Sequence, residues 1–141
     1  MVKIKIKKLH PDAKIPTYAN PGDAGMDIYS NEDLTIKPNH RALVKTGISL
    51  EFPKEYVALI WDKSGIAKNG VTTLSGVGDS GYRGEYKVVL LNIGSKPYEI
   101  KKGQKIAQIL IQPIIHPEIE EVKTLSKSKR GTGGFGSSGL N

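Results

Sequence analysis

The sequence predicts an all-β domain, a sandwich or a barrel, with one short helix and a flexible C-terminal tail. Short runs of β-branched and apolar residues recur along the chain, and Gly, Pro, Asn and Asp separate them at intervals of about ten residues. Most of the eight prolines fall at the ends of these runs, where a missing N–H costs little. The length of 141 residues suits one domain with a substantial core.

Five runs are predicted as strands. In the first run, Val2, Ile4 and Ile6 alternate with lysines, which we interpret as the solvent face of the strand. The sequence shows no internal repeat, so we assign all five strands to one domain. The four later runs are apolar and rich in β-branched residues, and they span residues 42–52, 56–61, 87–92 and 105–115.

Two segments depart from the strand pattern. Ser64 is predicted as the N-cap of one short helix and Gly70 as its stop. After about Val122 the chain becomes polar, basic and rich in glycine, a composition that cannot form a core. We therefore predict a β-barrel domain over residues 1–125 and a flexible glycine-rich arm over residues 126–141.

Composition excludes several classes of function. The absence of cysteine excludes a disulfide framework, a thiol nucleophile and a cysteine-bound metal. The three histidines are far apart, which argues against a histidine-rich metal site but leaves open a Mg²⁺ held by carboxylates or phosphates. The net charge of +7 suits either a nucleic acid or a small phosphate compound. Because no pair of aromatic and basic strands resembles an RNA-binding signature, we expect no nucleic-acid partner.

The hydropathy pattern argues against a membrane location. No apolar run approaches the roughly 18 residues that a membrane-spanning helix needs. The first eight residues alternate between apolar residues and lysine, and they lack the apolar stretch of a signal peptide. We therefore expect a soluble, cytoplasmic protein with no membrane partner.

The segment from Gly76 to Asn92 places a carboxylate, an aromatic ring and a cation in one tight loop. Asp79, Tyr82 and Arg83 stand among turn-forming glycines, directly before a predicted strand. The loop thus offers a base, a flat ring and a positive charge within a few residues. Taken alone, this composition fits a solvated hairpin tip more simply, with an Asx turn at the aspartate.

The chain ends in a segment suited to closing over a phosphate ligand. Residues 131–141 contain five glycines, whose backbone N–H groups can approach a ligand closely because no Cβ intervenes. Serine hydroxyls add donors, and the ring of Phe135 can lie on a base. The alternative is a solvated tail without a ligand.

Five segments together resemble the dUTP pyrophosphatase (dUTPase) family of the homotrimeric all-β kind. They occur in the family's order, at compatible spacings, and span nearly the whole chain. They are AGMDIYS at 24–30, DKSGIA at 62–67, GVGDSGYRG at 76–84, GQKIAQ at 103–108 and RGTGGFGSSG at 130–139.

The resemblance implies a fold, a reaction and an assembly. The implied fold is a distorted jelly roll, a barrel of the β-clip type. The implied reaction is hydrolysis of dUTP to dUMP and pyrophosphate with Mg²⁺, which limits uracil incorporation into DNA and supplies dUMP for dTMP synthesis. The implied assembly is a homotrimer with shared active sites, in which the arm of one subunit closes over a neighbour's site.

The resemblance also implies roles for individual residues. Asp79 matches the general base, which positions and deprotonates the attacking water. Tyr82 matches the ring that packs on the deoxyribose and leaves no room for a 2′-hydroxyl. Asp27 matches an acid that organises the site and reaches Mg²⁺ only through water, while the metal is held mainly by substrate phosphates and water. Without the match, Asp27 would be taken as a surface carboxylate.

The remaining implied residues contact substrate. The backbone of residues 73–82 forms the uracil site, and the Ser-Gly of the second segment binds phosphate. In the arm, Phe135 matches the ring that stacks on uracil, and Ser137, Ser138 and Gly139 match the γ-phosphate cradle. The full set of implied substrate contacts is Lys63, Ser64, Gly65, Thr73, Gly76, Val77, Tyr82, Lys87, Gln108, Arg130, Phe135, Gly136, Ser137 and Ser138.

Three positions depart from the family pattern. Lys63 stands where Arg is common, so the bidentate fork of a guanidinium is lost. Thr73 stands near a frequent Asn and lacks an amide for the base edge. Gly78 replaces a bulky aliphatic before Asp79, and the greater backbone freedom of glycine predicts a looser carboxylate.

Three other functions compete with dUTP hydrolysis. A dCTP deaminase, or a bifunctional deaminase–dUTPase, shares the fold, but the chain has no counterpart of the deaminating Glu segment. A β-sandwich nucleotide-binding or signalling module without turnover would not need Asp79. A basic nucleic-acid-binding β-barrel explains the charge but leaves Asp79 and the tail unexplained.

Overall fold

The computed structural model describes residues 2–135, 137 and 139, and it confirms a β fold with a single short helix, α1 (Ser64–Ala67), in that part of the chain. All strand pairs are antiparallel. The strands are β1 (Lys5–Lys8), β2 (Met26–Tyr29), β3 (Leu34–Ile36), β4 (Arg41–Lys45), β5 (Ile48–Glu51), β6 (Tyr56–Trp61), β7 (Val71–Thr73), β8 (Val77–Gly78), β9 (Lys87–Asn92), β10 (Tyr98–Ile100) and β11 (Lys105–Pro113).

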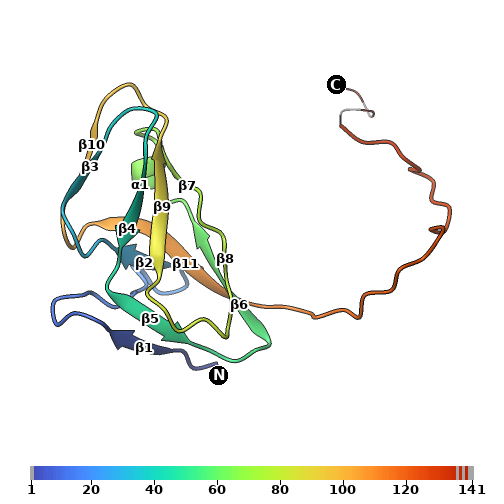
Figure 1. The fold of residues 1–141 in the computed structure, drawn as a ribbon, viewed down its shortest axis with the longest axis horizontal. Helices are drawn as coiled ribbons and strands as arrows, with labels where there is room; N and C mark the ends of the chain where they lie inside the picture. The colour runs from blue at the N-terminus through green and yellow to red at the C-terminus, as the bar shows by residue number, and fades with distance from the viewer. Residues whose placement is uncertain (1, 136, 138, 140–141) are drawn as a thin grey trace.

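The strands form two main sheets and two small ones. The four-stranded sheet has the order β2-β11-β6-β8, and the three-stranded sheet has the order β4-β9-β7. Two further pairs, β1-β5 and β3-β10, flank them (Figure 1). Consecutive strands often belong to different sheets, as β4 and β5 do. The arrangement agrees with the predicted jelly-roll class.

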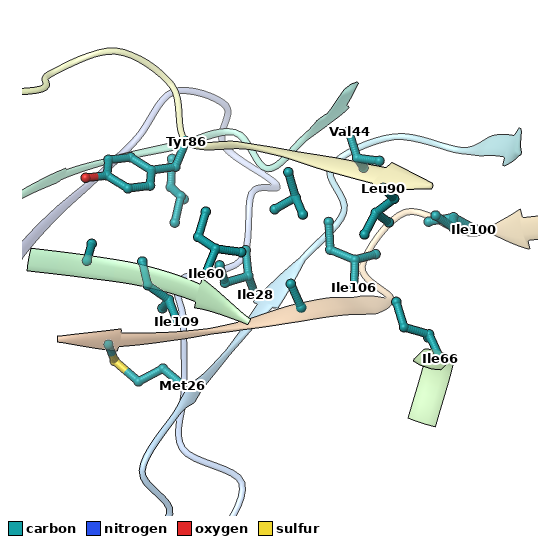
Figure 2. Close-up of a cluster of buried hydrophobic side chains, with 14 of the residues drawn as sticks. Met26, Ile28, Val44, Ile60, Ile66, Tyr86, Leu90, Ile100, Ile106 and Ile109 are labelled. Carbon is teal, nitrogen blue, oxygen red and sulfur yellow. The ribbon is translucent and has the colours of Figure 1, made fainter. Parts of the chain in front are cut away.

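The core lies between the two main sheets. Ile28, Ile60 and Ile109 of the four-stranded sheet face Val44 and Leu90 of the three-stranded sheet (Figure 2). All five are buried. Burying a Val, Leu or Ile side chain contributes about 1.5–3 kcal/mol each, so this layer of side chains fixes the relative position of the sheets.

One predicted strand is two strands in the structure. The run over residues 42–52 divides into β4 and β5 at Gly47, whose φ is +70°. A Cβ at this position would lie 2.8 Å from the Cβ of Ala13, so both the backbone conformation and the packing require glycine. The last predicted strand, 105–115, ends at Pro113 instead.

The helix is shorter than predicted, and its N-cap differs. The N-cap is Lys63 and makes no side-chain capping bond, so the prediction of Ser64 as N-cap is wrong by one residue. Gly70 has φ +82°, and a Cβ there would lie 2.8 Å from the backbone of Gly94. The helix nevertheless ends at Ala67 with Lys68 as its C-cap, so Gly70 closes the turn that follows and is not the helix stop that was predicted.

The chain leaves the sheets after β11. No described residue beyond Pro113 belongs to a strand or helix, and this segment runs away from the barrel in Figure 1. The predicted domain boundary at residues 125–126 stays a prediction. Among the described residues, no helix is long and apolar enough to cross a membrane.

Candidate active site

A cavity of about 520 Å³ opens beside β8 and the start of β9. Leu43 and Ile60 give it an apolar wall from the two main sheets. The structure brings together here five residues that the sequence assigned to the site, namely Gly76, Val77, Asp79, Tyr82 and Lys87. Their convergence follows from topology, because β8 pairs with β6 and β9 pairs with β4, so the connection between β8 and β9 spans both sheets.

Asp79 directly follows β8 at the mouth of this cavity. Gly78 and Val77 pair with Ala58 and Leu59 of β6, so the backbone before the aspartate is held in a ladder. The Asp79 carbonyl accepts a hydrogen bond from the Tyr82 N–H (3.1 Å) and closes the following turn. Its carboxylate is exposed and forms no ion pair with any described residue. It can therefore accept a proton from a bound water.

Tyr82 presents a ring to the same cavity. The side chain is 48% exposed, and its hydroxyl donates to the Glu85 carbonyl (3.0 Å). The ring covers Gly84, where a Cβ would lie 2.3 Å from the tyrosine hydroxyl. Arg83 donates to the Ser80 carbonyl (2.6 Å), so its guanidinium supports the turn. The flat ring of Tyr82 is thus fixed three residues along the chain from Asp79.

Gly78 accommodates the ring of Tyr86. A Cβ at residue 78 would lie 2.8 Å from Cε1 and 2.9 Å from the hydroxyl of Tyr86. The tyrosine ring therefore occupies the space that an aliphatic side chain at position 78 would need. Because Gly78 is paired in β8, the extra backbone freedom expected for this glycine is restrained by the sheet.

Asp27 is buried between two lysines on the other side of β6. Its side chain is 4% exposed, with Oδ1 2.6 Å from the Lys63 ammonium and Oδ2 2.6 Å from the Lys105 ammonium. Burial alone would raise the pKa of Asp27, but hydrogen bonds and charge from Lys105 and Lys63 outweigh burial and lower this pKa. The hydrogen bond to Asp27 likewise raises the pKa of Lys105. Asp27 is therefore not a surface carboxylate.

Gln108 joins three of the sequence segments. Its Nε2 donates to the Asp62 carbonyl (2.8 Å). A Cβ on Gly25 would lie 2.5 Å from its Oε1, so glycine is needed where the first segment crosses β11. The ion pair between Lys63 and Asp27 links segment 62–67 to segment 24–30, and the Gln108 bond links it to β11. Ser64 and Gly65 are exposed beside these contacts.

Asp62 fixes the backbone around Thr73, and the sequence did not reveal this role. Its carboxylate accepts from the Thr72 hydroxyl (2.6 Å) and from the Thr73 N–H (2.5 Å). The Thr73 hydroxyl in turn accepts from the Ser75 N–H (2.9 Å). Both donors lie on β7, 10 and 11 residues along the chain, so no local sequence signal marks this role. Thr73 lines an adjacent hollow that shares Gly76 and the next residue, Val77, with the Asp79 cavity.

The arm residues do not line the cavity of their own chain. Arg130 donates from Nε to the Gly133 carbonyl (2.9 Å), and Phe135 is fully exposed. The Ser137 N–H donates to the Gly134 carbonyl (3.0 Å) within the arm. The two other arm residues assigned to substrate contact, Gly136 and Ser138, lie outside the described residues.

The described residues do not form a metal cage. No group of three or more His, Cys, Asp or Glu side chains among them is arranged to hold an ion. The lysines that flank Asp27 take up both of its oxygens. The described residues thus fit a metal ion whose ligands are substrate phosphates and water, and they do not fit a metal ion chelated by carboxylates.

Comparisons with known proteins agree on one family. The dUTPase family model matches residues 11–139. The chain is 54% identical over 139 residues to the deoxyuridine 5′-triphosphate nucleotidohydrolase of Clostridium tetani, covering 96% of each chain. It is 49% identical over 143 residues to the enzyme of the same name from Clostridioides difficile, covering 99% of this chain and 100% of that one.

Solved structures show the same relationship. The dUTPase of Staphylococcus bacteriophage 80alpha with dUpNHpp superimposes with a TM-score of 0.92 at 30% identity, covering 98% of this chain and 99% of that one. A mutant dUTPase of S. aureus phage phi11, described with a structural Mg(II) ion, matches at a TM-score of 0.82 and 25% identity, covering 89% and 99%. With the family match over nearly its whole length, the chain belongs to the dUTPase family.

Proposed function

We propose that the protein hydrolyses dUTP to dUMP and pyrophosphate, with Asp79 as the general base. The relatives at about half identity carry the name of this activity over almost the full chain. The observation that carries the assignment of the base is the exposed Asp79 carboxylate, which lies beside Tyr82 in one cavity and forms no ion pair with a described residue. A base needs a free lone pair within reach of water, and Asp79 offers it.

In the proposed reaction, a water oxygen attacks the α-phosphorus. A bond forms between this oxygen and phosphorus, the bond from phosphorus to the β-bridging oxygen breaks, and pyrophosphate leaves. The proton of the attacking water goes to the Asp79 carboxylate. The turn after β8 holds the backbone of Asp79 in place before the reaction.

The nucleoside is held by β8 and Tyr82. β8 is the last strand of its sheet, so the backbone groups of Val77, which face away from β6, can bond the uracil edge, whereas the Gly76 carbonyl already accepts from the Ile60 N–H (3.0 Å). The ring of Tyr82 lies against the deoxyribose. A 2′-hydroxyl would collide with this ring, which favours dUTP over UTP.

The triphosphate lies along a basic wall. Lys87 lines the cavity, and Ser64 and Gly65 are exposed beside the ion pair between Lys63 and Asp27. Mg²⁺, when bound to the phosphate oxygens and water, neutralises the charge that develops on the leaving pyrophosphate. Because its oxygens pair with lysines, Asp27 positions this wall and reaches the metal only through water.

The active site is completed by neighbouring subunits in the proposal. The described arm residues are exposed and lie apart from the cavity of their own chain, as expected for an arm that covers another subunit's site in a homotrimer. Arg130 and Ser137 then add donors to the phosphates, and Phe135 stacks on uracil. The cytoplasmic location and the role in limiting uracil in DNA stay predictions.

A substrate panel tests the proposal. The protein is incubated with each dNTP and with UTP in the presence of Mg²⁺, and pyrophosphate and ammonia release are measured. We expect pyrophosphate from dUTP, with kcat/KM at least about 10²-fold above that for UTP. Ammonia from dCTP would indicate the deaminase alternative, and dUTP binding without turnover would indicate a binding module.

A further inference from the structure

The hydroxyl of Tyr86 has no hydrogen-bond partner among the described residues, although the side chain is only 4% exposed. The ring belongs to the hydrophobic core, and its hydroxyl end points away from the other core side chains in Figure 2. The Tyr86 N–H donates to the Ile48 carbonyl (2.9 Å), which fixes the backbone from which the ring projects. A buried hydroxyl without a partner costs free energy, so its position calls for an acceptor close to the end of the ring.

The hydroxyl is directed toward the residue that precedes the base. It would lie 2.9 Å from a Cβ at Gly78, so only glycine admits it there. Tyr86 and Asp79 line the same cavity. The rings of Tyr82 and Tyr86 meet edge to face, with centroids 5.6 Å apart, and this contact holds the hydroxyl end of Tyr86 beside the substrate side of the cavity.

The charged groups around the Tyr86 hydroxyl favour the Asp79 carboxylate as its hydrogen-bond acceptor. Burial, and then the charge of Asp79, raises the pKa of Tyr86, while Arg83 acts in the opposite direction. The phenol therefore keeps its proton at neutral pH and is a donor. Glu85 and Lys87 also line the cavity and lie 3.8 Å apart as an ion pair. Since Glu85 Oε1 also accepts from the Gly47 N–H, the Asp79 carboxylate is the available anion on this side.

The other residues around the Tyr86 hydroxyl are either apolar or already bonded elsewhere. The other sheets contribute Leu43 and Ile60 to the cavity wall. The guanidinium of Arg83 donates to the Ser80 and Tyr82 carbonyls and lies 4.0 Å from Glu51, so it is engaged at the turn. The Tyr86 hydroxyl is therefore a donor left without a partner on this face of the cavity among the described residues.

We propose that Tyr86 is a positioning residue for the base: with substrate bound, its hydroxyl donates a hydrogen bond to the Asp79 carboxylate, directly or through one water. This inference rests on the proposed function. The bond orients the carboxylate so that its other oxygen faces the attacking water. It also stabilises the anionic form, which keeps Asp79 a competent base at lower pH.

The variant Tyr86→Phe tests the bond, because it keeps the ring and removes only the hydroxyl. We expect kcat for dUTP to fall about tenfold with KM within about twofold of wild type. The acid limb of the kcat–pH profile should move to higher pH by about half a unit or more, because an anion that loses a donor is protonated more easily. The free energy of unfolding should not fall, since no protein hydrogen bond is lost.

Two further variants separate positioning from packing. Tyr98→Phe is the matched control, because the Tyr98 hydroxyl accepts only a 3.3 Å bond from Gln104 and does not line the cavity, and it should leave the pH profile unchanged. The double variant Gly78→Val with Tyr86→Val refills the same space without a hydroxyl. It should behave like Tyr86→Phe if it folds, and its acid limb should be displaced in the same direction.

The outcomes are distinct for the two claims. If wild type releases pyrophosphate from dUTP and Tyr86→Phe matches it in kcat and acid limb, the role of Tyr86 is wrong and the proposed function stands. A lower kcat with an unmoved acid limb would leave Tyr86 only a packing role and also contradict the inference. Wild-type protein without turnover of dUTP would overturn both.

Discussion

Asp79 and Asp27, the two carboxylates that the resemblance assigns to the site, lie on different sides of β6 and in opposite environments. Asp79 is exposed at the cavity and has no ion pair with a described residue, whereas Asp27 is buried between the ammonium groups of Lys63 and Lys105. A carboxylate with a free lone pair can accept a proton from water. One that is locked between two cations has a lowered pKa and serves to hold segments together. In the proposed function, the first environment suits a general base and the second suits a residue that holds its neighbours in place.

Asp27→Asn should destabilise the protein at neutral pH. Removal of the charge leaves two lysines facing each other, and we expect a loss of about 2 kcal/mol, less than for a fully buried pair because both ammonium groups stay partly hydrated. The pKa of Asp27 is lowered on folding, so the wild-type contribution is complete above the unfolded pKa of about 4 and is lost as pH falls through the lower folded pKa.

Urea unfolding of wild type and Asp27→Asn at pH 7 and near pH 3 measures this difference. The gap between the two proteins should be large at pH 7 and should shrink in acid. Asp12→Asn removes a carboxylate from an exposed pair with Lys102 and serves as the control without a measurable effect. An equal gap at both pH values would contradict the role of the ion pairs.

At the scale of elements, the connection between β8 and β9 forms the site because small residues admit aromatic rings. Gly78 accommodates the Tyr86 ring, and Gly84 lies beneath the Tyr82 ring. Neither glycine has a positive φ, so packing and not backbone strain requires it. The rings in turn contact each other edge to face. The positions of the two tyrosine rings and of Asp79 are thereby linked within the connection between β8 and β9.

Gly84→Ala should disturb substrate selection more than stability. Its Cβ would lie 2.3 Å from the Tyr82 hydroxyl, and the half-exposed ring can swing away at a cost of less than about 1 kcal/mol of folding free energy. We expect kcat/KM for dUTP to fall about tenfold and the preference over UTP to narrow. Gly81→Ala, in the same loop with open space around its Cβ position, is the matched control. Identical kinetics for the two variants would refute the role of Gly84.

The sequence predicted the long strands and missed the short ones for a physical reason. β6 spans Tyr56–Trp61 and β9 spans Lys87–Asn92, as predicted from their apolar runs. β8 has two residues, too few for any periodicity, and exists because β6 offers it an edge. The break at Gly47 depends on Ala13, which is distant in sequence, so local patterning could not reveal it.

The same limit applies to the candidate site. Asp79 and Tyr82 stand out by residue type within one loop and by resemblance to a family. The role proposed for Tyr86 was not predicted, because it depends on the approach of its ring to Gly78 of β8, a contact that no sequence pattern specifies. Asp62 was missed because the groups that donate to its carboxylate lie on β7, about ten residues further along the chain. Contacts of this kind follow from strand pairing and not from composition.

At the scale of the whole molecule, the barrel and the arm have separate tasks. The barrel buries the core and forms the cavity, whereas the described residues after Pro113 add no strand and are exposed except around Gly133 and Gly134. Such an arm gains an ordered position only by contact with a ligand or another subunit. Folding and closure are thus expected to depend on different parts of the chain.

Removal of residues 130–141 should leave folding intact and reduce turnover strongly. The described residues of this segment contribute nothing to the hydrophobic core, so the midpoint of urea unfolding should not change. Turnover of dUTP should fall because Arg130, Phe135 and Ser137 are lost together. Measurement of both quantities on the same preparation separates the effects. Full activity in the shortened protein would mean that the arm has no part in the site.

The substitution Asp79→Asn tests the central claim most directly. The amide has the shape of the carboxylate but cannot take the water's proton, so we predict that kcat for dUTP falls about 10²–10⁴-fold while binding of a non-hydrolysable dUTP analogue is largely kept. Asp33→Asn, away from the cavity, is the control and should retain wild-type turnover. Near-normal kcat in Asp79→Asn would contradict the account and would assign the base to another carboxylate, with Asp27 the next to examine.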